Sequence, residues 1–328
     1  MQKQQFELGD PPSDGISNVK FSFSDPSLLL VSSWDKTVRL YDVSKNKMKL
    51  KYFHDASILD CCFYNNDQGY SGGLDRKIKT VDFNTGKESI LGTHDDAIKC
   101  LEKVNETNVV ISGSWDKSVG LWDQRSSIPC VGKFSQPEKV YTLDVVNNIL
   151  VVGMAARQIY IYDIRNLSEA MQKRESSLKF MTRVIKCMPN GEGYASSSIE
   201  GRVAVEFFDT SEESQRRKYA FKCHREIIDG ISHVYPVNAL SFHPKFGTFA
   251  SGGGDGNVYI WDGFNKKRLR KFTKYPTTIS SLSFNSEGSL LAVASSYTFE
   301  EGEKDHPPDS IYIRSITDNE VKPKTKAK

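Results

Sequence analysis

One group of side chains in the sequence could perform hydrolysis. His94, Ser112 and Asp116 are the three residue types of a serine hydrolase, in which Ser attacks, His carries the proton and Asp orients the His. The chain around Ser112 lacks the G-x-S-x-G turn that exposes the nucleophile in α/β-hydrolases. The alternative is a structural role, in which the three groups hydrogen-bond to one another inside a folded unit.

A second group could bind an anion. Arg183, Arg202 and Lys222 lie in the segments "RVIKC", "GRVAVEFFD" and "YAFKCHR", and a guanidinium fork is well shaped for a phosphate or a carboxylate. The same part of the chain contains Glu200 and Glu206, which could pair with these cations instead. The residue types alone leave both interpretations open.

Other patterns point away from chemistry. The chain has no Walker A loop, no H-E-x-x-H and no EF-hand pattern. The glycine cluster "SGGGDGN" at 251–257 lies between two apparent strands and reads as a hairpin turn, and the acidic segment 299–305 reads as a solvated loop rather than a cation site. We therefore expect no catalytic constellation, no cofactor and no metal.

Composition limits the class of protein. Lys and Arg number 44 against 41 Asp and Glu, and the net charge of +3 is too small for a general polyanion-binding field. The six cysteines show no C-x-x-C, and no stretch resembles a membrane span or a signal peptide. We expect buried, reduced thiols and a nucleocytoplasmic protein.

Internal repeats predict the fold. Strand ends recur as "VRLYD", "IKTVD", "VGLWD" and "IYIYD", at intervals of 40, 41 and 40 residues, which is the period of WD40 repeats. Later units end with "VEFFD", "VYIWD" and "IYIRS", at wider intervals of 46, 53 and 52 residues, so extra loop is expected around blades five to seven. The prediction is an all-β fold, a seven-bladed WD40 β-propeller.

The chain ends have separate predicted roles. The isolated strand "QFEL" near the N-terminus is expected to complete the seventh blade and close the ring, which protects the sheet edges. We predict one propeller domain over 1–320 and a basic flexible tail over 321–328.

The repeats favour the structural role for the His-Ser-Asp group. In WD40 proteins, an Asp in the turn after the second strand typically bonds to a His in the loop that enters the blade. Such turn residues are Asp35, Asp75, Asp116 and Asp255. Blade three has the complete set, His94, Ser112, Asp116 and Trp122. We read this set as a structural brace.

Two of these turns also contain a tryptophan. Trp34 in "SSWDKTVRL" and Trp115 in "SGSWDKSVG" should lie on the face where loops enter the blades. Trp and Arg are common interface anchors, so the two rings indicate a peptide-binding face. The alternative is that each ring folds back over its own blade.

Several longer segments resemble one family. "SSWDKTVRLYDV", "FSQPEKVYTL", "SSIEGRVAVEFFD" and "YAFKCHR" are similar to the budding-uninhibited-by-benzimidazole WD40 proteins of the mitotic spindle checkpoint, and the resemblance spans all seven blades. A related mRNA-export WD40 family of nuclear pores shares "SIEGRVA" and "FKCHR" and remains the alternative.

The resemblance implies a non-enzymatic adaptor at the kinetochore, in the nucleus and also in the cytoplasm. Such proteins bind a GLEBS motif of a checkpoint kinase or kinase-like protein, and phosphothreonine MELT repeats of a kinetochore scaffold; no membrane or direct nucleic acid contact is expected. Trp34, Trp115 and Arg183 would then contact the bound segments, and Arg202 and Lys222 would bind the phosphothreonine. A Lys at 222 keeps the charge but lacks the fork of an Arg.

Overall fold

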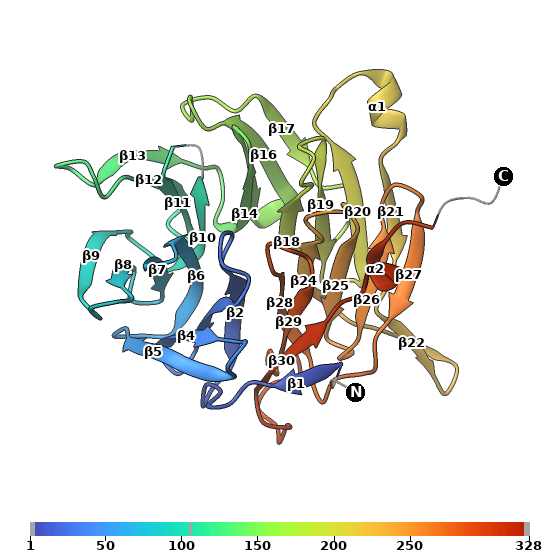
Figure 1. The fold of residues 1–328 in the computed structure, drawn as a ribbon. Helices are drawn as coiled ribbons and strands as arrows, with labels where there is room; N and C mark the ends of the chain where they lie inside the picture. The colour runs from blue at the N-terminus through green and yellow to red at the C-terminus, as the bar shows by residue number, and fades with distance from the viewer. Residues whose placement is uncertain (1–3, 105–106, 325–328) are drawn as a thin grey trace.

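The computed structural model describes residues 4–104 and 107–324. Within these residues the strands form seven four-stranded antiparallel sheets and one two-stranded sheet. The ribbon passes from sheet to sheet around the molecule, from blue to red (Figure 1). The all-β propeller prediction is therefore confirmed.

Each blade has one strand at each of four positions, counted from the axis outward. The first strands are β2 (Ile16–Phe21), β6 (Ile58–Asn65), β10 (Ile98–Val104), β14 (Val140–Val146), β18 (Thr182–Cys187), β24 (Val237–Phe242) and β28 (Ile279–Phe284). The second are β3 (Leu28–Ser33), β7 (Gln68–Gly73), β11 (Val109–Ser114), β15 (Ile149–Met154), β19 (Gly193–Ser198), β25 (Phe249–Gly253) and β29 (Leu290–Ser295). The third are β4 (Thr37–Asp42), β8 (Lys77–Asp82), β12 (Ser118–Trp122), β16 (Gln158–Asp163), β20 (Arg202–Phe207), β26 (Val258–Asp262) and β30 (Ser310–Ser315). The outermost are β5 (Lys47–Phe53), β9 (Glu88–Thr93), β13 (Cys130–Ser135), β17 (Gln172–Glu175), β21 (Tyr219–Lys222), β27 (Lys267–Lys271) and β1 (Gln5–Glu7).

The first strands form a closed ring. Each contacts the first strand of the next blade, and β28 contacts β2, which brings the two ends of the chain together. The apolar cores lie between neighbouring blades: Val38 and Leu40 of β4, for example, pack with Ile58 and Phe63 of β6. Alternation along each strand thus supplies an apolar face for each neighbour.

The N-terminal strand closes the last blade. β1 pairs with β30 in the register Gln5↔Arg314 to Glu7↔Tyr312, and the blue strand lies beside the red one in Figure 1. The predicted closure is confirmed. It covers the edge of β30 that would otherwise be free to pair with another chain.

The packed structure continues to the short helix α2 (Asp318–Val321). Its first turn is capped by Thr317 and Glu320, and Glu320 also forms an ion pair with Arg314 at 3.1 Å. Val321, where we placed the start of the flexible tail, is fully buried in the core of blades six and seven. Residues 325–328 of that tail lie outside the described residues.

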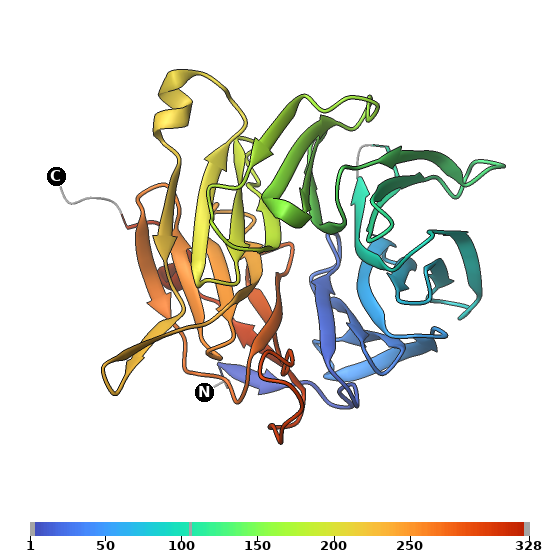
Figure 2. The same cartoon turned by 180° about the vertical axis from the view of Figure 1, so that it is seen from behind.

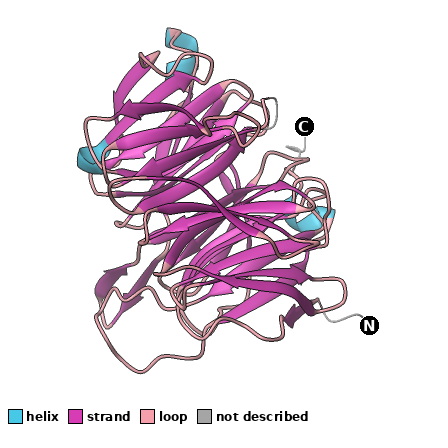
Figure 3. Ribbon diagram, turned by 90° about the vertical axis from the view of Figure 1, so that its left-hand side faces the viewer, coloured by secondary structure: helices cyan, strands magenta, loops and turns pink. Residues whose placement is uncertain are grey.

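Three additions account for the two widest repeat intervals, those of 53 and 52 residues. They are the helix α1 (Glu212–Arg216) in blade five, a hairpin of β22 (Arg225–Ile228) and β23 (Ile231–Val234) between blades five and six, and a loop at 296–309 between β29 and β30. In Figure 1, α1 projects from the upper side, whereas the hairpin and the loop project from the lower side. The hairpin stands clear of the sheets in Figure 2, and the helices are confined to the periphery in Figure 3.

No helix among the described residues is long and apolar enough to cross a membrane. All six cysteines lie in the described part of the chain and are free; five are buried, and Cys130 is exposed. The expected burial of the thiols is therefore found for five cysteines and not for Cys130.

Candidate peptide-binding face

A cavity of about 660 Å³ lies at the centre of the ring, where residues of the first strands of all seven blades line it. Its rim contains both turn tryptophans, Arg183 of β18 and Phe299 of the 296–309 loop, and its wall is formed by the first strands. The turns between second and third strands therefore meet at one end of the propeller. We call this end the funnel face.

Trp34 presents its ring on the funnel face from a well-fixed backbone. Its N–H donates to the Gly15 carbonyl at 2.8 Å, and its own carbonyl accepts from Ser57 Oγ at 3.0 Å. The residue remains 46% exposed. The backbone is therefore held by two neighbouring segments while the ring is open to a partner.

Trp115 is more enclosed than Trp34. Lys139 Nζ lies 5.9 Å from the centre of its ring, and the backbone N–H of Trp115 donates to the Ala97 carbonyl at 3.0 Å. The indole Nε1 is buried and has no hydrogen-bond acceptor among the described residues. A buried donor without an acceptor is rare, and a bound segment could supply the missing carbonyl.

Arg183 already has partners within the chain. Its Nε donates to Asn238 Oδ1 at 3.0 Å, and one guanidinium nitrogen lies 3.8 Å from Glu300 Oε1. Burial lowers the pKa of Arg183, and the nearby Glu300 charge opposes this shift. The acidic segment that we expected to be only a solvated loop therefore places one carboxylate at the funnel rim.

Arg202 and Lys222 face the same side of blade five. They are directly opposite in the register of β20 and β21, which places their Cβ atoms about 5 Å apart. No hydrogen bond or ion pair engages the Lys222 side chain within the described residues. Arg202 Nε lies 3.1 Å from Glu200 Oε2, without the alignment of a hydrogen bond.

Glu200 is shared between two arginines. Arg225, which follows the "KCH" segment and was missed in the sequence analysis, donates to the Glu200 carbonyl at 2.8 Å and to its Oε1 at 3.1 Å. Partial burial raises the pKa of Glu200, but Arg225 and Arg202 outweigh it, so the pKa is lowered. Glu206 accepts instead from Tyr194 at 2.6 Å. The Glu200 carboxylate therefore pairs with two arginines, and Lys222 adds a third cation to this cluster.

An apolar strip connects Arg183 with this cationic cluster. Phe180, Met181 and Ile199 are all exposed, and the Ile199 N–H donates to the Met181 carbonyl at 3.1 Å. None of these three residues was predicted from the sequence. Their signal is the apolar pair directly before "TRV" and the isoleucine in an otherwise polar turn.

The hydrogen bonds expected in blade three are all present. His94 Nδ1 lies 2.9 Å from Asp116 Oδ2, His94 Nε2 lies 2.7 Å from Ser112 Oγ, and Trp122 Nε1 donates to the same Oγ at 2.7 Å. Ser112 is fully buried, so its hydroxyl is inaccessible to a substrate. The arrangement resembles a catalytic triad in its contacts but lacks the access that catalysis needs.

The same contacts recur in two other blades. The groups are His54, Ser71 and Asp75 in blade two, and His224, Ser251, Asp255 and Trp261 in blade six. The expected His partner is wrong for blade one. Asp35 accepts instead from Arg39 at 2.9 Å and from the Ser13 N–H at 3.1 Å, because the loop that enters this blade has no His.

A group of partly buried charges lies on the first strands, and two of them, Glu102 and Lys186, line the cavity. Glu102 contacts Lys20 and lies 3.0 Å from Lys186 Nζ, which is 2.8 Å from Asp144 Oδ1. Burial alone would raise the pKa of Glu102, but Lys186 and Lys20 outweigh it and lower the pKa to about 2. The ion pairs connect the first strands of blades one, three, four and five across the channel.

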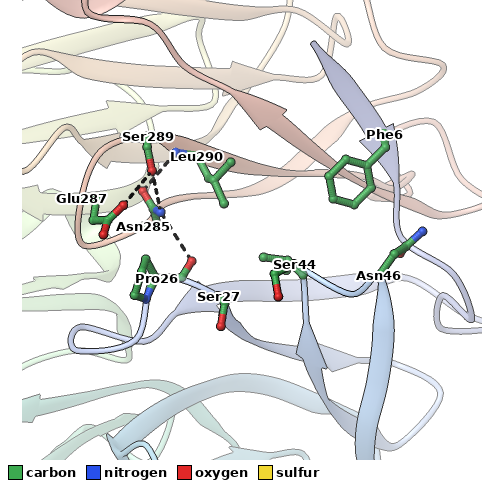
Figure 4. Close-up of a pocket in the computed structure, with 10 residues that line it drawn as sticks. Phe6, Pro26, Ser27, Ser44, Asn46, Asn285, Glu287, Ser289 and Leu290 are labelled. Atoms are coloured by element: carbon green, nitrogen blue, oxygen red, sulfur yellow. Dashed lines mark hydrogen bonds between the residues drawn. The ribbon is translucent and has the colours of Figure 1, made fainter. Parts of the chain in front are cut away.

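A second cavity, of about 500 Å³, lies between blades seven and one at the end away from the funnel face. Asn285 donates to the Pro26 carbonyl at 3.4 Å and to Ser289 Oγ at 3.1 Å, and Ser289 donates to Glu287 at 3.3 Å (Figure 4). These polar groups already satisfy one another. Among the described residues that line this cavity, Glu287 is the single charged side chain, so the charged cluster of blade five has no counterpart here.

Comparisons with known proteins identify the family. The family model "WD domain, G-beta repeat" matches residues 2–42, 87–123 and 221–262. A protein of Arabidopsis thaliana named "Mitotic checkpoint protein BUB3.1" is 57% identical over 98% of this chain and 95% of the relative. The "Mitotic checkpoint protein bub3" of Dictyostelium discoideum is 46% identical over 96% of each chain.

This chain belongs to the Bub3 family. The resemblance drawn from "FSQPEKVYTL" and "GRVAVEFFD" is confirmed. The alternative family is also represented: "mRNA export factor GLE2" of Chaetomium thermophilum is 34% identical over 99% of this chain and 94% of the relative. The export factor covers a similar span of this chain at a lower identity than the two checkpoint proteins, so the chain is placed with the Bub3 proteins.

Proposed function

We propose that this Bub3-family chain is a non-enzymatic adaptor of the mitotic spindle checkpoint. It would bind a GLEBS segment of a checkpoint kinase or kinase-like protein across the funnel face, and a phosphothreonine MELT repeat of a kinetochore scaffold at blade five. By holding both, it would recruit the kinase to unattached kinetochores. The names of its Bub3 relatives support the checkpoint role.

The balance of charge at blade five carries the proposal. Arg202, Lys222 and Arg225 contribute three positive charges against the single carboxylate of Glu200, which leaves two uncompensated charges. A phosphothreonine carries a charge of about −1.5 to −2 at neutral pH, and it offers three acceptor oxygens. An unphosphorylated threonine offers neither, so binding would depend on phosphorylation.

The funnel face suits a peptide that contains an acidic residue. Trp34 offers an exposed ring, Trp115 a buried N–H donor and Arg183 a guanidinium. A carboxylate from the partner would take the place of Glu300 beside Arg183 and Asn238. Glu300 Oε1 lies 3.8 Å from the guanidinium and accepts from Asn238 Nδ2 at 3.4 Å, so this exchange replaces one long ion pair and one long hydrogen bond.

A catalytic role has little support from the His-Ser-Asp groups. They recur in blades two, three and six with the same contacts, and their serines are fully buried. We interpret His94, Ser112, Asp116 and Trp122 as a brace that fixes the turn of blade three. The proposed role places the protein at kinetochores, in the nucleus and in the cytoplasm.

Paired peptides test the proposal. Fluorescent MELT-type peptides with and without phosphothreonine would be titrated into the protein by anisotropy at two salt concentrations. We expect binding of the phosphorylated peptide only, and weaker binding at high salt because partly exposed charges are screened. If neither peptide binds while a nucleoporin GLEBS peptide does, the export-factor alternative replaces the checkpoint assignment.

A further inference from the structure

The cavity between blades seven and one lies at the seam where the chain closes its ring. Four segments form its wall: β1, the turn between β2 and β3, the turn between β4 and β5, and the turn between β28 and β29. Its volume of about 500 Å³ is within the range of about 300 to 1,000 Å³ that is usual for ligand sites. We call it the seam cavity.

The wall of the seam cavity is fixed by bonds within the chain. The Oδ1 atom of the buried Asn285 accepts from the Leu290 N–H at 3.0 Å, and its amide nitrogen donates to the Pro26 carbonyl of blade one at 3.4 Å. Within blade one, the Val43 N–H donates to the Ser27 carbonyl at 2.8 Å. The cavity is therefore preformed and needs no occupant to hold its shape.

Apolar side chains line the seam cavity between its two rims. They are Phe6, Pro26, Val43 and Leu290. Phe6 and Leu290 pack against the core of blades seven and one but are only partly buried there. An aromatic side chain placed against them would remove apolar surface from water, and it could pack edge to face with Phe6.

Glu287 brings a negative charge to one end of the lining. In Figure 4, Glu287 lies at one end and Phe6 at the other, with Leu290 between them. Glu287 Oε2 accepts from Ser289 Oγ at 3.3 Å, and within the described residues no Lys, Arg or His pairs with this carboxylate. A basic residue of an occupant would therefore meet an unpaired carboxylate.

The backbone of β1 has a free edge beside Phe6. The Leu8 N–H donates to the Ile311 carbonyl at 2.8 Å, so the alternation of an antiparallel pair points the backbone groups of Gln5 and Glu7 away from β30. The Glu7 carbonyl accepts from Asn46 Nδ2 at 3.3 Å. The Gln5 N–H and carbonyl have no partner in the described part of the chain, so an extended peptide could pair with them.

We propose that the seam cavity binds an extended segment of a protein partner. An aromatic side chain of the segment packs against Phe6 and Leu290, and an Arg or Lys two residues away pairs with Glu287. Alternate side chains of an extended segment point the same way and lie about 7 Å apart, so both can enter one cavity. The site is at the end away from the funnel face, so its occupant does not compete with a peptide bound there.

Three short fluorescent peptides test this chemistry. Each consists of Gly and Ser, with Phe and Arg two positions apart in the first, Arg alone in the second, and Phe and Glu in the third. Anisotropy measures their affinities for the wild-type protein. We expect the second peptide to bind at least tenfold more weakly than the first, because the ring is missing. We expect a loss of about three- to tenfold for the third, because a partly exposed ion pair is replaced by repulsion.

Two variants locate the binding. Glu287→Lys should reverse the charge preference, so that the Phe–Glu peptide binds more tightly than the Phe–Arg peptide; Glu303→Lys, an exposed carboxylate of the 296–309 loop, is its control. Ser44→Trp places a large ring in the lining and should weaken all three peptides. Asn84→Trp is its control, because Asn84 is an exposed residue in the corresponding turn of blade two.

The melting temperature of each variant is measured before the titrations, and the charge reversal at Glu287 carries the test if Ser44→Trp fails to fold. Three results would overturn the inference: equal or absent binding of the three peptides to the wild type, an unchanged preference in Glu287→Lys, or equal losses in Ser44→Trp and Asn84→Trp. Binding of GLEBS and phosphothreonine peptides should be the same in every variant, so the inference and the proposed function can fail separately.

Discussion

Blades three and five use the same turn, between their second and third strands, in opposite ways. In blade three, Asp116 is held by His94 and Ser118, and the serine to which His94 bonds is fully buried. In blade five, Glu200 and Arg202 occupy the turn, and they remain partly exposed. A blade can therefore lose the brace and still fold, and its turn is then free to bind.

The difference has a physical cause. A buried His-Asp-Ser set satisfies all its polar groups internally, so it stabilises the blade and offers nothing to a partner. The blade-five cluster has more cations than carboxylates, which is tolerable only because it is near solvent. The surplus charge is what an anionic ligand can use.

The largest expected effect is on binding at blade five. Arg202→Glu should abolish phosphopeptide binding, a loss of about 100-fold or more, because a charge-assisted contact is replaced by repulsion. Anisotropy with the paired peptides measures it, and GLEBS binding should persist. Arg216→Glu, on the exposed helix α1, is the control; unchanged affinity in Arg202→Glu would sink the phosphate assignment.

The largest expected effect on stability is in blade three. His94→Ala removes a group that bonds to both Asp116 and Ser112, and it should lower the free energy of unfolding by about 3 kcal/mol because buried partners lose their bonds. Urea unfolding measures this, with exposed His233→Ala as the control. A loss as small as that of the control would show that blade three needs no brace.

The tryptophans test whether the funnel face binds rather than packs. Trp34→Ala should weaken GLEBS peptide binding about tenfold or more, as for other aromatic anchors, at a nearly unchanged melting temperature. Isothermal titration calorimetry measures the affinity. Phe264→Ala is the control, because Phe264 is an even more exposed aromatic in a turn of blade six outside the funnel lining. A large drop in melting temperature would support a packing role for Trp34.

Acid should weaken the blade-three brace in two steps. Burial lowers the pKa of His94, partly opposed by Asp116. Hydrogen bonds from Ser118, the Asp95 N–H and His94 lower the pKa of Asp116, although burial opposes them.

Because each group has a lower pKa in the folded state, the unfolded chain takes up the proton first. Stability should therefore fall as pH drops below about 6.5, and again below about 4. The urea midpoints of the wild type and of Asp116→Asn should converge as the pH falls below about 4. The stabilisation that the ionised Asp116 carboxylate provides begins to be lost there. A constant gap down to pH 3 would contradict this assignment.

The smallest expected effect is at Glu200. Glu200→Gln removes the one negative charge in the blade-five cluster, and it should tighten phosphopeptide binding about two- to fivefold, with little change in stability because the ion pairs are partly exposed. Anisotropy measures it against Glu192→Gln, a carboxylate that pairs with Arg217 elsewhere in blade five. Weaker binding would mean that Glu200 orients Arg202 instead of competing with the phosphate.

The sequence by itself determined the repeat architecture. Strand alternation and the 40-residue interval are local properties, and strands with an apolar face must pack against neighbours, so seven units imply a closed ring. The strand "QFEL" could be assigned to blade seven because the seventh repeat lacked an outermost strand of its own. The His-Ser-Asp contacts were also predictable, because their spacing repeats with the blades.

Only the tertiary structure decided how the surface charges are shared. Glu200 and Arg225 are 25 residues apart, and Glu300 lies far along the chain from Arg183, so no local pattern predicts either pairing. The hairpin had a readable signal in "IIDGI", yet its docking against the blade-five turn depends on contacts with Gly201. Such pairings form only when the closed ring brings loops of different blades to the same face.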